Sequence, residues 1–202
     1  MDTALQALLG RLESEGQRHD QGEPEHDRRM LNLERATAEV LALWIRSSHR
    51  RSVLEIGTSN GYSTLWLAWA VQPAGGRVTS IDRSAAKHAL ADANLREAGL
   101  RDVVELAWGE GAEVIARLDG PFDAVFFDAD RYSAPAQLEL LMPKLAPDVL
   151  LFADNARSHP QEIAGYLAAV KALSGFVNTI IPVGKGLSVA YRAGAAPGDQ
   201  GR

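Results

Sequence analysis

The sequence predicts an α/β fold built on a doubly wound, mostly parallel sheet of seven strands, one of them antiparallel. Short apolar runs alternate five times with stretches of helical character, which is the pattern of a parallel sheet covered by helices. A loop containing two glycines follows the first apolar run and opens directly into an apolar helix. Near the end of the chain, two apolar runs are joined by the short loop Pro182–Gly186, which predicts a hairpin.

Composition sets the broad class of the protein. The 202 residues suit one α/β domain, with 46% hydrophobic and 23% charged residues. The net charge of -5 gives no reason to expect nucleic acid or a membrane surface as a partner. The absence of cysteine excludes disulfides, thiolate zinc sites and a cysteine nucleophile. With neither a signal-like start nor an apolar run of membrane-spanning length, we expect a cytoplasmic protein.

The first part of the chain is predicted to be helical. A helix over residues 2–15 places four leucines on one face, and the polar residues 16–27, which contain glycine and proline, are predicted to form a loop. A second helix is expected over Leu33–Ser47, followed by a buried strand within Ser52–Ile56. We therefore divide the chain into an N-terminal helix and mobile loop (1–26), one α/β domain (27–192) and a tail that its composition predicts to be disordered (193–202).

The remaining elements follow in regular alternation. Ser84 is a helix N-cap and Gly99 a helix stop, while Pro135 and Pro160 each lie in the first turn of a helix. Strands are predicted at residues 77–81, 103–107, 122–127, 149–152, 176–181 and 187–191. Helices are predicted at residues 64–71, 84–98, 110–118, 135–145 and 160–173.

The loop after the first strand suggests a nucleotide-like ligand. Its pattern is Glu55-x-Gly57-x-x-x-Gly61, whereas a dinucleotide fingerprint would require glycine in place of Ser59. An acidic residue on the strand and a looser loop suit a ligand that has an ammonium group and no pyrophosphate, such as S-adenosylmethionine (SAM). The alternative is a glycine turn that only lets the helix pack on its strand.

Acidic and amide side chains follow nearly every predicted strand, at the edge where open parallel sheets bind ligands. Asp82 stands where a carboxylate would bind ribose hydroxyls, although it could also serve the start of the next helix. Asp128, Asp154 and Asn155 supply oxygen atoms that suit Mg²⁺ or Ca²⁺, although such residues also begin turns. Because two carboxylates without a cation would repel each other, a metal site is favoured.

Five motifs occur in an order that resembles the cation-dependent O-methyltransferases, the group of the catechol and caffeoyl-CoA enzymes. The motifs are LEIGTSNGYSTLWLA, SID, FDAVFFDADRYS, LFADN and VGKGLSVAYR, within residues 30–192. The resemblance implies the class I, Rossmann-like methyltransferase fold, a homodimer, and a small, catechol-like hydroxylated acceptor. It also implies that Mg²⁺, or else Ca²⁺ or Mn²⁺, is held by Asp128, Asp154 and Asn155. The implied SAM contacts are Leu31, Leu33, Glu55, Gly57, Thr58, Ser59, Gly61, Ser63, Asp82, Arg83, Gly109, Glu110, Gly111 and Asp128.

The sequence departs from the resemblance at two places. Where these enzymes usually carry a lysine that can act as a base, this chain has Arg131, which stays protonated and cannot accept a proton. We assign catalytic roles to Asp128 and Arg131. Because Arg131 cannot act as the base, it could bind an acidic substrate. The segment after Asn155 is shorter than the substrate loop of plant relatives, so the acceptor is not carried over.

Three other functions are compatible with parts of the sequence. A metal-independent methyltransferase would use Glu55 and Asp82 but not the acidic cluster. A SAM-binding protein without catalysis is suggested by Arg131. An NAD-dependent oxidoreductase is disfavoured by Ser59, which stands where the dinucleotide fingerprint requires glycine.

Overall fold

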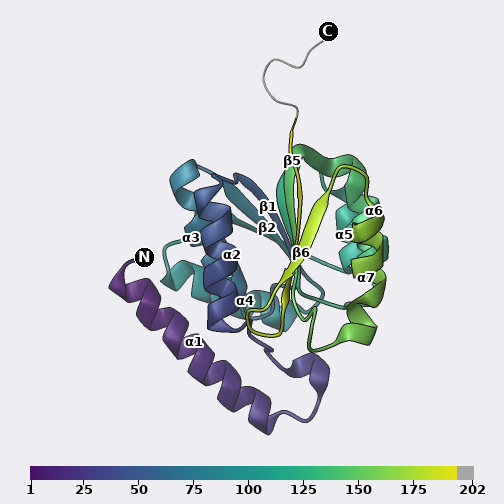
Figure 1. Ribbon diagram of the computed structural model, residues 1–202. Helices are drawn as coiled ribbons and strands as arrows, with labels where there is room; N and C mark the ends of the chain where they lie inside the picture. The colour runs from purple at the N-terminus through teal and green to yellow at the C-terminus, as the bar shows by residue number, and fades with distance from the viewer. Residues whose placement is uncertain (195–202) are drawn as a thin grey trace.

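A seven-stranded sheet runs through the protein, with helices on both faces, in the computed structural model, which describes residues 1–194 (Figure 1). The strand order is β3-β2-β1-β4-β5-β7-β6, and only β7 runs against its neighbours. This confirms the predicted doubly wound sheet with one antiparallel strand. The strands are β1 (Ser52–Ile56), β2 (Arg77–Asp82), β3 (Val104–Trp108), β4 (Phe122–Phe127), β5 (Leu145–Ala153), β6 (Val177–Ile181) and β7 (Leu187–Arg192).

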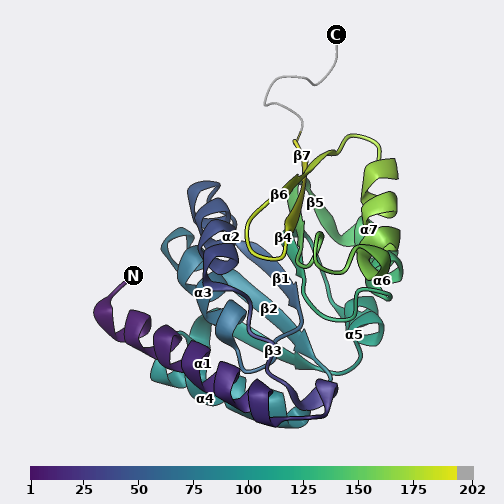
Figure 2. The same ribbon diagram turned by 60° about the horizontal axis from the view of Figure 1, so that its bottom comes forward.

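The helices divide into two groups, one on each face of the sheet (Figures 1 and 2). The first face is covered by α1 (Thr3–Gly22), α2 (Arg35–Ser47), α3 (Tyr62–Val71) and α4 (Ala85–Glu97). The second face is covered by α5 (Gly111–Arg117), α6 (Ala134–Leu141) and α7 (Pro160–Ala172). Helix α1 lies outermost on the first face, alongside α4 (Figure 2).

Each central strand contributes side chains to two separate hydrophobic cores. In β4, Phe126 belongs to the core under α1–α3, whereas Phe127 belongs to the core under α5–α7. In β5, Phe152 belongs to the core under α1–α3 and Leu151 to the core under α5–α7. Because side chains alternate across a strand and both faces are buried, these strands appear in the sequence as continuous apolar runs.

Helix α1 is longer than predicted, because it continues through Gly22 instead of ending near residue 15. The polar stretch is helical because it packs against the returning chain. Gly16 is buried, and a Cβ there would lie 2.5 Å from the side-chain nitrogen of Asn32. Near the end of the helix, the Asp20 carboxylate accepts the backbone N–H groups of Met30 (2.7 Å) and Leu31 (2.8 Å).

The connection between α6 and β5 also differs from the prediction. Helix α6 ends at Leu141 instead of residue 145, and β5 begins at Leu145 instead of residue 149. A 3-10 turn over Met142–Lys144 joins them. The early start of β5 comes from pairing with β4, where Leu145 lies opposite Phe122 before an irregularity in the ladder.

Two expectations concern the parts of the chain outside the sheet. The predicted disordered tail, residues 193–202, lies outside the described residues from position 195 onward. Over residues 1–194, none of the helices combines the length and the apolar character that crossing a membrane would require.

Candidate functional site

The loops that follow the parallel strands form a continuous row at one edge of the sheet. The N–H of Asp128, after β4, donates to the carbonyl of Ile56 at the end of β1 (2.9 Å). The N–H of Asp154, after β5, donates to the carbonyl of Phe127 (3.3 Å). The ends of β1, β4 and β5 are therefore in direct contact, which brings the acidic residues predicted from the sequence to one place.

The two glycines of the loop after β1 are required by close packing. Both have left-handed backbone angles, with φ of 117° at Gly57 and 86° at Gly61. A Cβ at Gly57 would lie 2.5 Å from the carbonyl oxygen of Asp128, and one at Gly61 would lie 3.1 Å from Ala91 of α4. Packing thus accounts for these glycines, so the case for a ligand depends on the polar groups around them.

Asp82, at the end of β2, holds this loop in place. One carboxylate oxygen accepts the N–H of Ser59 and the other accepts the N–H of Ser84, each at 2.8 Å. Asp82 therefore does serve the start of α4, as the alternative interpretation proposed. Each carboxylate oxygen can accept more than one hydrogen bond, so the group is also able to bind the hydroxyls of a ribose.

Glu55 is completely buried beneath the same loop. One of its oxygens accepts the hydroxyls of Thr64 and Ser80, both at 2.5 Å, while the other has no partner. Burial raises the pKa of Glu55 to about 7, although the hydroxyls of Ser63, Ser80 and Thr64 oppose the rise. The unpartnered oxygen is a buried acceptor that no group of the described protein satisfies.

Asp128, Asp154 and Asn155 form an acidic cluster beside this loop. Burial and mutual repulsion raise the pKa of Asp128 well above its usual range, and burial raises that of Asp154. Asn155, in a left-handed conformation with φ of 66°, donates from its amide to one oxygen of Asp154 at 2.9 Å. The other oxygen of Asp154 is buried and has no partner.

The chemistry of the cluster fits a divalent cation. Across residues 1–194, no three Asp, Glu, His or Cys side chains converge to hold a metal on their own. The predicted set instead combines two carboxylates with one amide oxygen, which leaves positions for water or substrate. The unpartnered oxygen of Asp154 and the repulsion between the carboxylates are both conditions that a bound cation would relieve.

The segment before α2 passes over the glycine loop. The hydroxyl of Ser59 donates to the carbonyl of Met30 at 2.7 Å, which places Leu31 next to the loop. Leu31 has a φ of 50° and is 48% exposed. Leu33, which was also predicted to contact SAM, has its side chain in the core under α1–α3.

The predicted adenine end of the site is formed by the residues after β2 and β3. Arg83 is exposed and lies 3.2 Å from Asp27 and 4.0 Å from Glu110. Gly109 has a φ of 141°, and a Cβ at Gly111 would lie 2.7 Å from the side chain of Gln137. Trp108, the last residue of β3, lies between them and Arg83, and its side chain is 63% exposed.

Arg131 and Lys185 are cations whose charges act on the acidic cluster. Each lowers the pKa of Asp128 and of Asp154. The guanidinium of Arg131 is bound to Glu162 at 2.6 and 2.8 Å, and its catalytic role stays a prediction. Lys185 lies between two glycines, a pattern that by itself does not predict its proximity to this edge.

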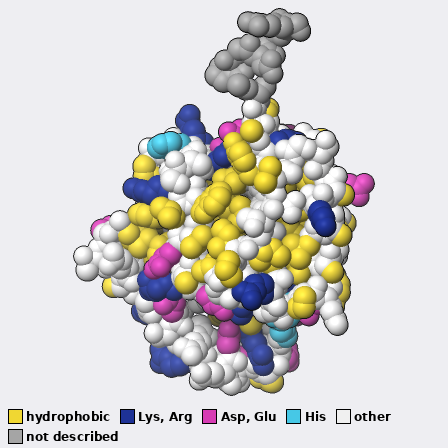
Figure 3. All heavy atoms as spheres, viewed as in Figure 1, with side chains coloured by type: hydrophobic (Ala, Val, Ile, Leu, Met, Phe, Trp, Pro, Cys, Tyr) yellow, Lys and Arg dark blue, Asp and Glu magenta, His cyan; other side chains and the backbone are white. Residues whose placement is uncertain are grey.

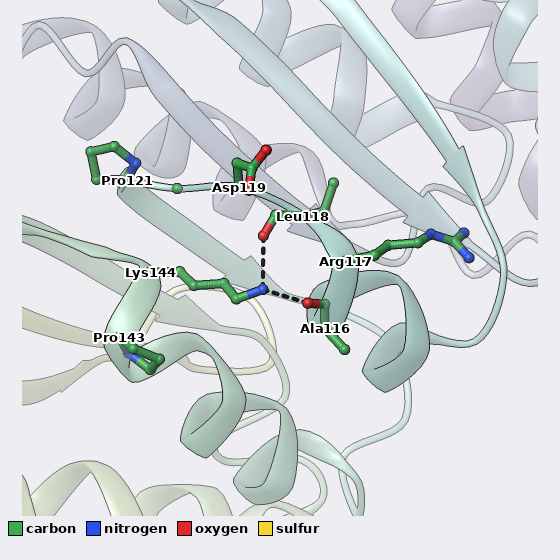
Figure 4. A pocket seen from close by; sticks show the side chains of 8 residues that line it. Ala116, Arg117, Leu118, Asp119, Pro121, Pro143 and Lys144 are labelled. Carbon is green, nitrogen blue, oxygen red and sulfur yellow. Dashed lines mark hydrogen bonds between the residues drawn. The ribbon is translucent and has the colours of Figure 1, made fainter.

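A separate hollow of about 400 Å³ lies at the opposite edge of the sheet, before β4 and β5 (Figure 4). It is lined by residues 116–121 and by Pro143 and Lys144. The Lys144 ammonium donates to three carbonyls at the end of α5, those of Ile115, Ala116 and Leu118, at 2.6–2.9 Å. This lysine therefore stabilises a helix end and is not part of the candidate site.

Comparisons with known proteins place the chain among methyltransferases. Residues 54–156, just over half of the chain, match the family described as "Methyltransferase domain". A catechol O-methyltransferase of Niastella koreensis is 32% identical over 121 residues, which is 58% of this chain and 54% of that protein. Another, from Mycobacterium tuberculosis, is 35% identical over 118 residues, or 58% and 53% of the two chains. The matched region thus spans about half the length of these relatives.

Solved structures extend the likeness to nearly the whole chain. An O-methyltransferase from Bacillus cereus, solved in complex with SAH, has a TM-score of 0.78 and 26% identity, and the match covers 96% of this chain and 92% of that one. The fold is therefore the class I SAM methyltransferase fold. By these matches and its motifs, the chain belongs to the methyltransferase domain family.

Proposed function

We propose that this protein is a SAM-dependent O-methyltransferase acting on a hydroxyl of a small, catechol-like molecule, with a divalent cation positioning the acceptor. The observation that carries the proposal is the acidic cluster, where a buried oxygen of Asp154 lacks a partner beside the glycine loop. The names of the similar proteins and the SAH bound in the Bacillus cereus structure support the reaction and the cofactor. A cytoplasmic location stays a prediction.

In this proposal, the residues at the strand ends divide between cofactor and acceptor. Asp82 accepts the ribose hydroxyls, and the unpartnered oxygen of Glu55 lies beneath the methionine portion. Asp128, Asp154 and Asn155 would hold the cation, which when bound lowers the pKa of a nearby hydroxyl. With SAM bound, the acceptor hydroxyl would release its proton to solvent and its oxygen would take the methyl group, while the C–S bond breaks and its electron pair stays on sulfur. Proximity and electrostatics supply most of the acceleration.

Methyl transfer from SAM to catechol, followed by mass spectrometry, tests this function. We expect the wild type to form methylated catechol with Mg²⁺ present and to stop when a chelator is added. Asp154→Ala should lose at least 100-fold in rate, since it removes a ligand of the proposed site. Asp119→Ala, which removes an exposed carboxylate at the opposite edge, is the matched control and should keep full activity.

A metal-independent SAM methyltransferase is the second candidate. It is favoured by the observation that no three acidic, histidine or cysteine side chains converge within residues 1–194. Chelator and Asp154→Ala would then leave the rate unchanged, while SAM binding would persist.

A further inference from the structure

The turn that follows the acidic cluster, residues 155–159, is held in place by the loop between β6 and β7. The carbonyl of Gly186 accepts the N–H of Ala156 at 2.9 Å. The carbonyl of Lys185 accepts the N–H groups of Arg157 (2.9 Å) and Ser158 (3.2 Å). The packing is close, because a Cβ at Gly186 would lie 2.5 Å from the side chain of Arg157. These contacts fix the backbone of the turn, and with it the place from which each of its side chains projects.

The hydroxyl of Ser158 is directed back toward the cluster. Its Oγ lies 3.1 Å from the amide oxygen of Asn155 and 2.8 Å from Nδ1 of His159. A serine hydroxyl has one hydrogen to donate, and an amide oxygen can only accept. The hydrogen of Ser158 therefore goes to Asn155, and His159 donates to Ser158 from Nδ1. The hydrogen bonds run in one direction, from the imidazole through the hydroxyl to the amide.

The amide of Asn155 extends this chain of hydrogen bonds to Asp154. Its Nδ2 donates to one carboxylate oxygen of Asp154 at 2.9 Å. Both side chains are buried, with 4% of Asp154 and 8% of Asn155 exposed. An ionised carboxylate accepts and does not donate, so the amide nitrogen faces Asp154 and the amide oxygen faces Ser158. The two contacts together fix which way the amide is turned.

These hydrogen bonds leave oxygen positions free on both buried residues. The Asp154 oxygen that receives the amide is satisfied, whereas its other oxygen is buried and has no partner among residues 1–194. The amide oxygen of Asn155 has two lone pairs, and the hydroxyl of Ser158 occupies one of them. Carboxylate and amide oxygens presented in this way are the ligands that Mg²⁺ prefers.

We propose that Ser158 is a positioning residue, whose hydroxyl holds the Asn155 amide so that Asn155 and Asp154 each present an oxygen to the divalent cation. The inference rests on the proposed function. Ser158 acts through Asn155, and it contacts neither SAM nor the acceptor in this role. Partners that hydrogen-bond to metal ligands are typically worth about 10–100-fold in metal affinity. We expect the lower end of that range, about tenfold, because the amide keeps its bond to Asp154.

Titration with Mn²⁺ measures this effect without turnover, because the electron paramagnetic resonance signal of the free ion falls as the ion binds. Mn²⁺ prefers the same oxygen ligands as Mg²⁺. We expect Ser158→Ala to bind Mn²⁺ about tenfold more weakly than the wild type, and Asp154→Ala to lose the site. Ser158→Thr should restore wild-type binding, because it keeps the hydroxyl. Ser14→Ala, which removes an exposed hydroxyl bonded to a carbonyl of α1, is the matched control.

The Mg²⁺ dependence of methyl transfer gives a second readout that a merely structural role would not produce. Ser158→Ala should need about ten times more Mg²⁺ for half-maximal transfer to catechol, and should regain the wild-type kcat once Mg²⁺ saturates. Equal Mn²⁺ affinity of wild type and Ser158→Ala, or an equal loss of rate at every Mg²⁺ concentration, would overturn this inference alone. If the wild type bound Mn²⁺ no better than Asp154→Ala, the metal-dependent function would fail, and this inference with it.

Discussion

Glu55 shows how a single residue links the stability of the protein to its candidate cofactor site. The carboxyl group is fully buried, with one oxygen satisfied by two hydroxyls and the other unpartnered. Its pKa of about 7 exceeds the ordinary value of 4.5, so the folded protein holds a proton that the unfolded chain releases. Stability therefore falls as pH rises from about 4.5 to about 7, and the full cost is present above that range.

Glu55→Gln should remove this pH dependence, because the amide has the same shape and does not ionise. We expect the free energy of unfolding of the variant, relative to wild type, to increase by about 3 kcal/mol between pH 4.5 and pH 8. Urea unfolding at several pH values measures the difference. A difference between the two proteins that stayed constant across this range would show that Glu55 is not the titrating group.

At the residue scale, the sequence predicted which strand ends come together, but not all of the contacts made there. Acidic residues that follow apolar runs are visible in a sequence, and the structure brings Asp128, Asp154 and Asn155 together as expected. The approach of the loop between β6 and β7 was not visible, because this loop meets the chain after Asn155 only through tertiary contacts with residues 156–158. The burial of Leu33 depends in the same way on the packing of α1 against α2 and α3.

Helix α1 is part of the main core and not an appendage. Its apolar face joins the cluster under α2 and α3, and Glu13 ties it to both helices. The Glu13 carboxylate accepts the hydroxyl of Tyr62 at 2.5 Å and lies 2.7 Å from Arg35. Hydrophobic burial and these contacts of Glu13 hold α1 in place beside the segment that passes over the glycine loop.

Leu9→Ala tests whether α1 contributes to global stability. Leu9 is fully buried, so its truncation leaves a cavity and should lower the free energy of unfolding by roughly 2–5 kcal/mol. Chemical unfolding followed by circular dichroism provides the measurement, with the exposed Leu31→Ala as the control of equal chemistry. If Leu9→Ala changed stability by no more than Leu31→Ala, helix α1 would be only loosely attached.

The end of helix α5 depends on one lysine. The Lys144 ammonium donates to three carbonyls at the end of α5, two of which, those of Ala116 and Leu118, are drawn in Figure 4. The helix dipole also favours a positive charge there. Lys144→Met keeps the length and apolar stem of the side chain but leaves those carbonyls to water. We expect thermal unfolding to show a loss of about 1–3 kcal/mol with methyl transfer retained. An unchanged melting temperature would contradict this role.

At the element scale, the strands were easier to predict than the helix ends. Strands buried on both faces form apolar runs that stand out in the sequence, so all seven were found. The predicted end of α1 was wrong because a polar, glycine-containing stretch resembles a loop in the sequence. In the structure, Asp20 binds the returning chain. The predicted start of β5 was wrong because the first residues of this strand are fixed by pairing with β4 and not by their own propensity.

The molecule as a whole presents an apolar surface at one side of the sheet. Figure 3 shows hydrophobic side chains gathered in the middle of the face on which α2 and β6 lie in Figure 1. On these two elements, Leu43 is 64% exposed and Val177 is 76% exposed. Strand β6 is also an edge strand, with one side of its backbone unpaired by the sheet. Such a surface favours association, so the predicted homodimer stays our expectation.

Sedimentation velocity tests the homodimer. We expect the wild type to sediment as a dimer at micromolar concentration and Val177→Lys to shift it to the monomer, because a charge would be buried at the contact. Leu90→Lys, at an exposed position of α4, is the control and should leave the dimer intact. A wild type that stays monomeric over the whole concentration range would rule the prediction out.

The whole arrangement places a hydrogen-bonded loop, a carboxylate from the neighbouring strand and an acidic cluster along one edge of the sheet. Calorimetric titration of the wild type and Asp82→Ala with SAM is the measurement that decides whether this edge binds the cofactor. We predict one SAM bound per wild-type chain and at least tenfold weaker binding by the variant, which loses hydrogen bonds to a charged group. Absence of SAM binding by a folded wild type would contradict a cofactor site at this edge and leave the glycine loop as a packing element only.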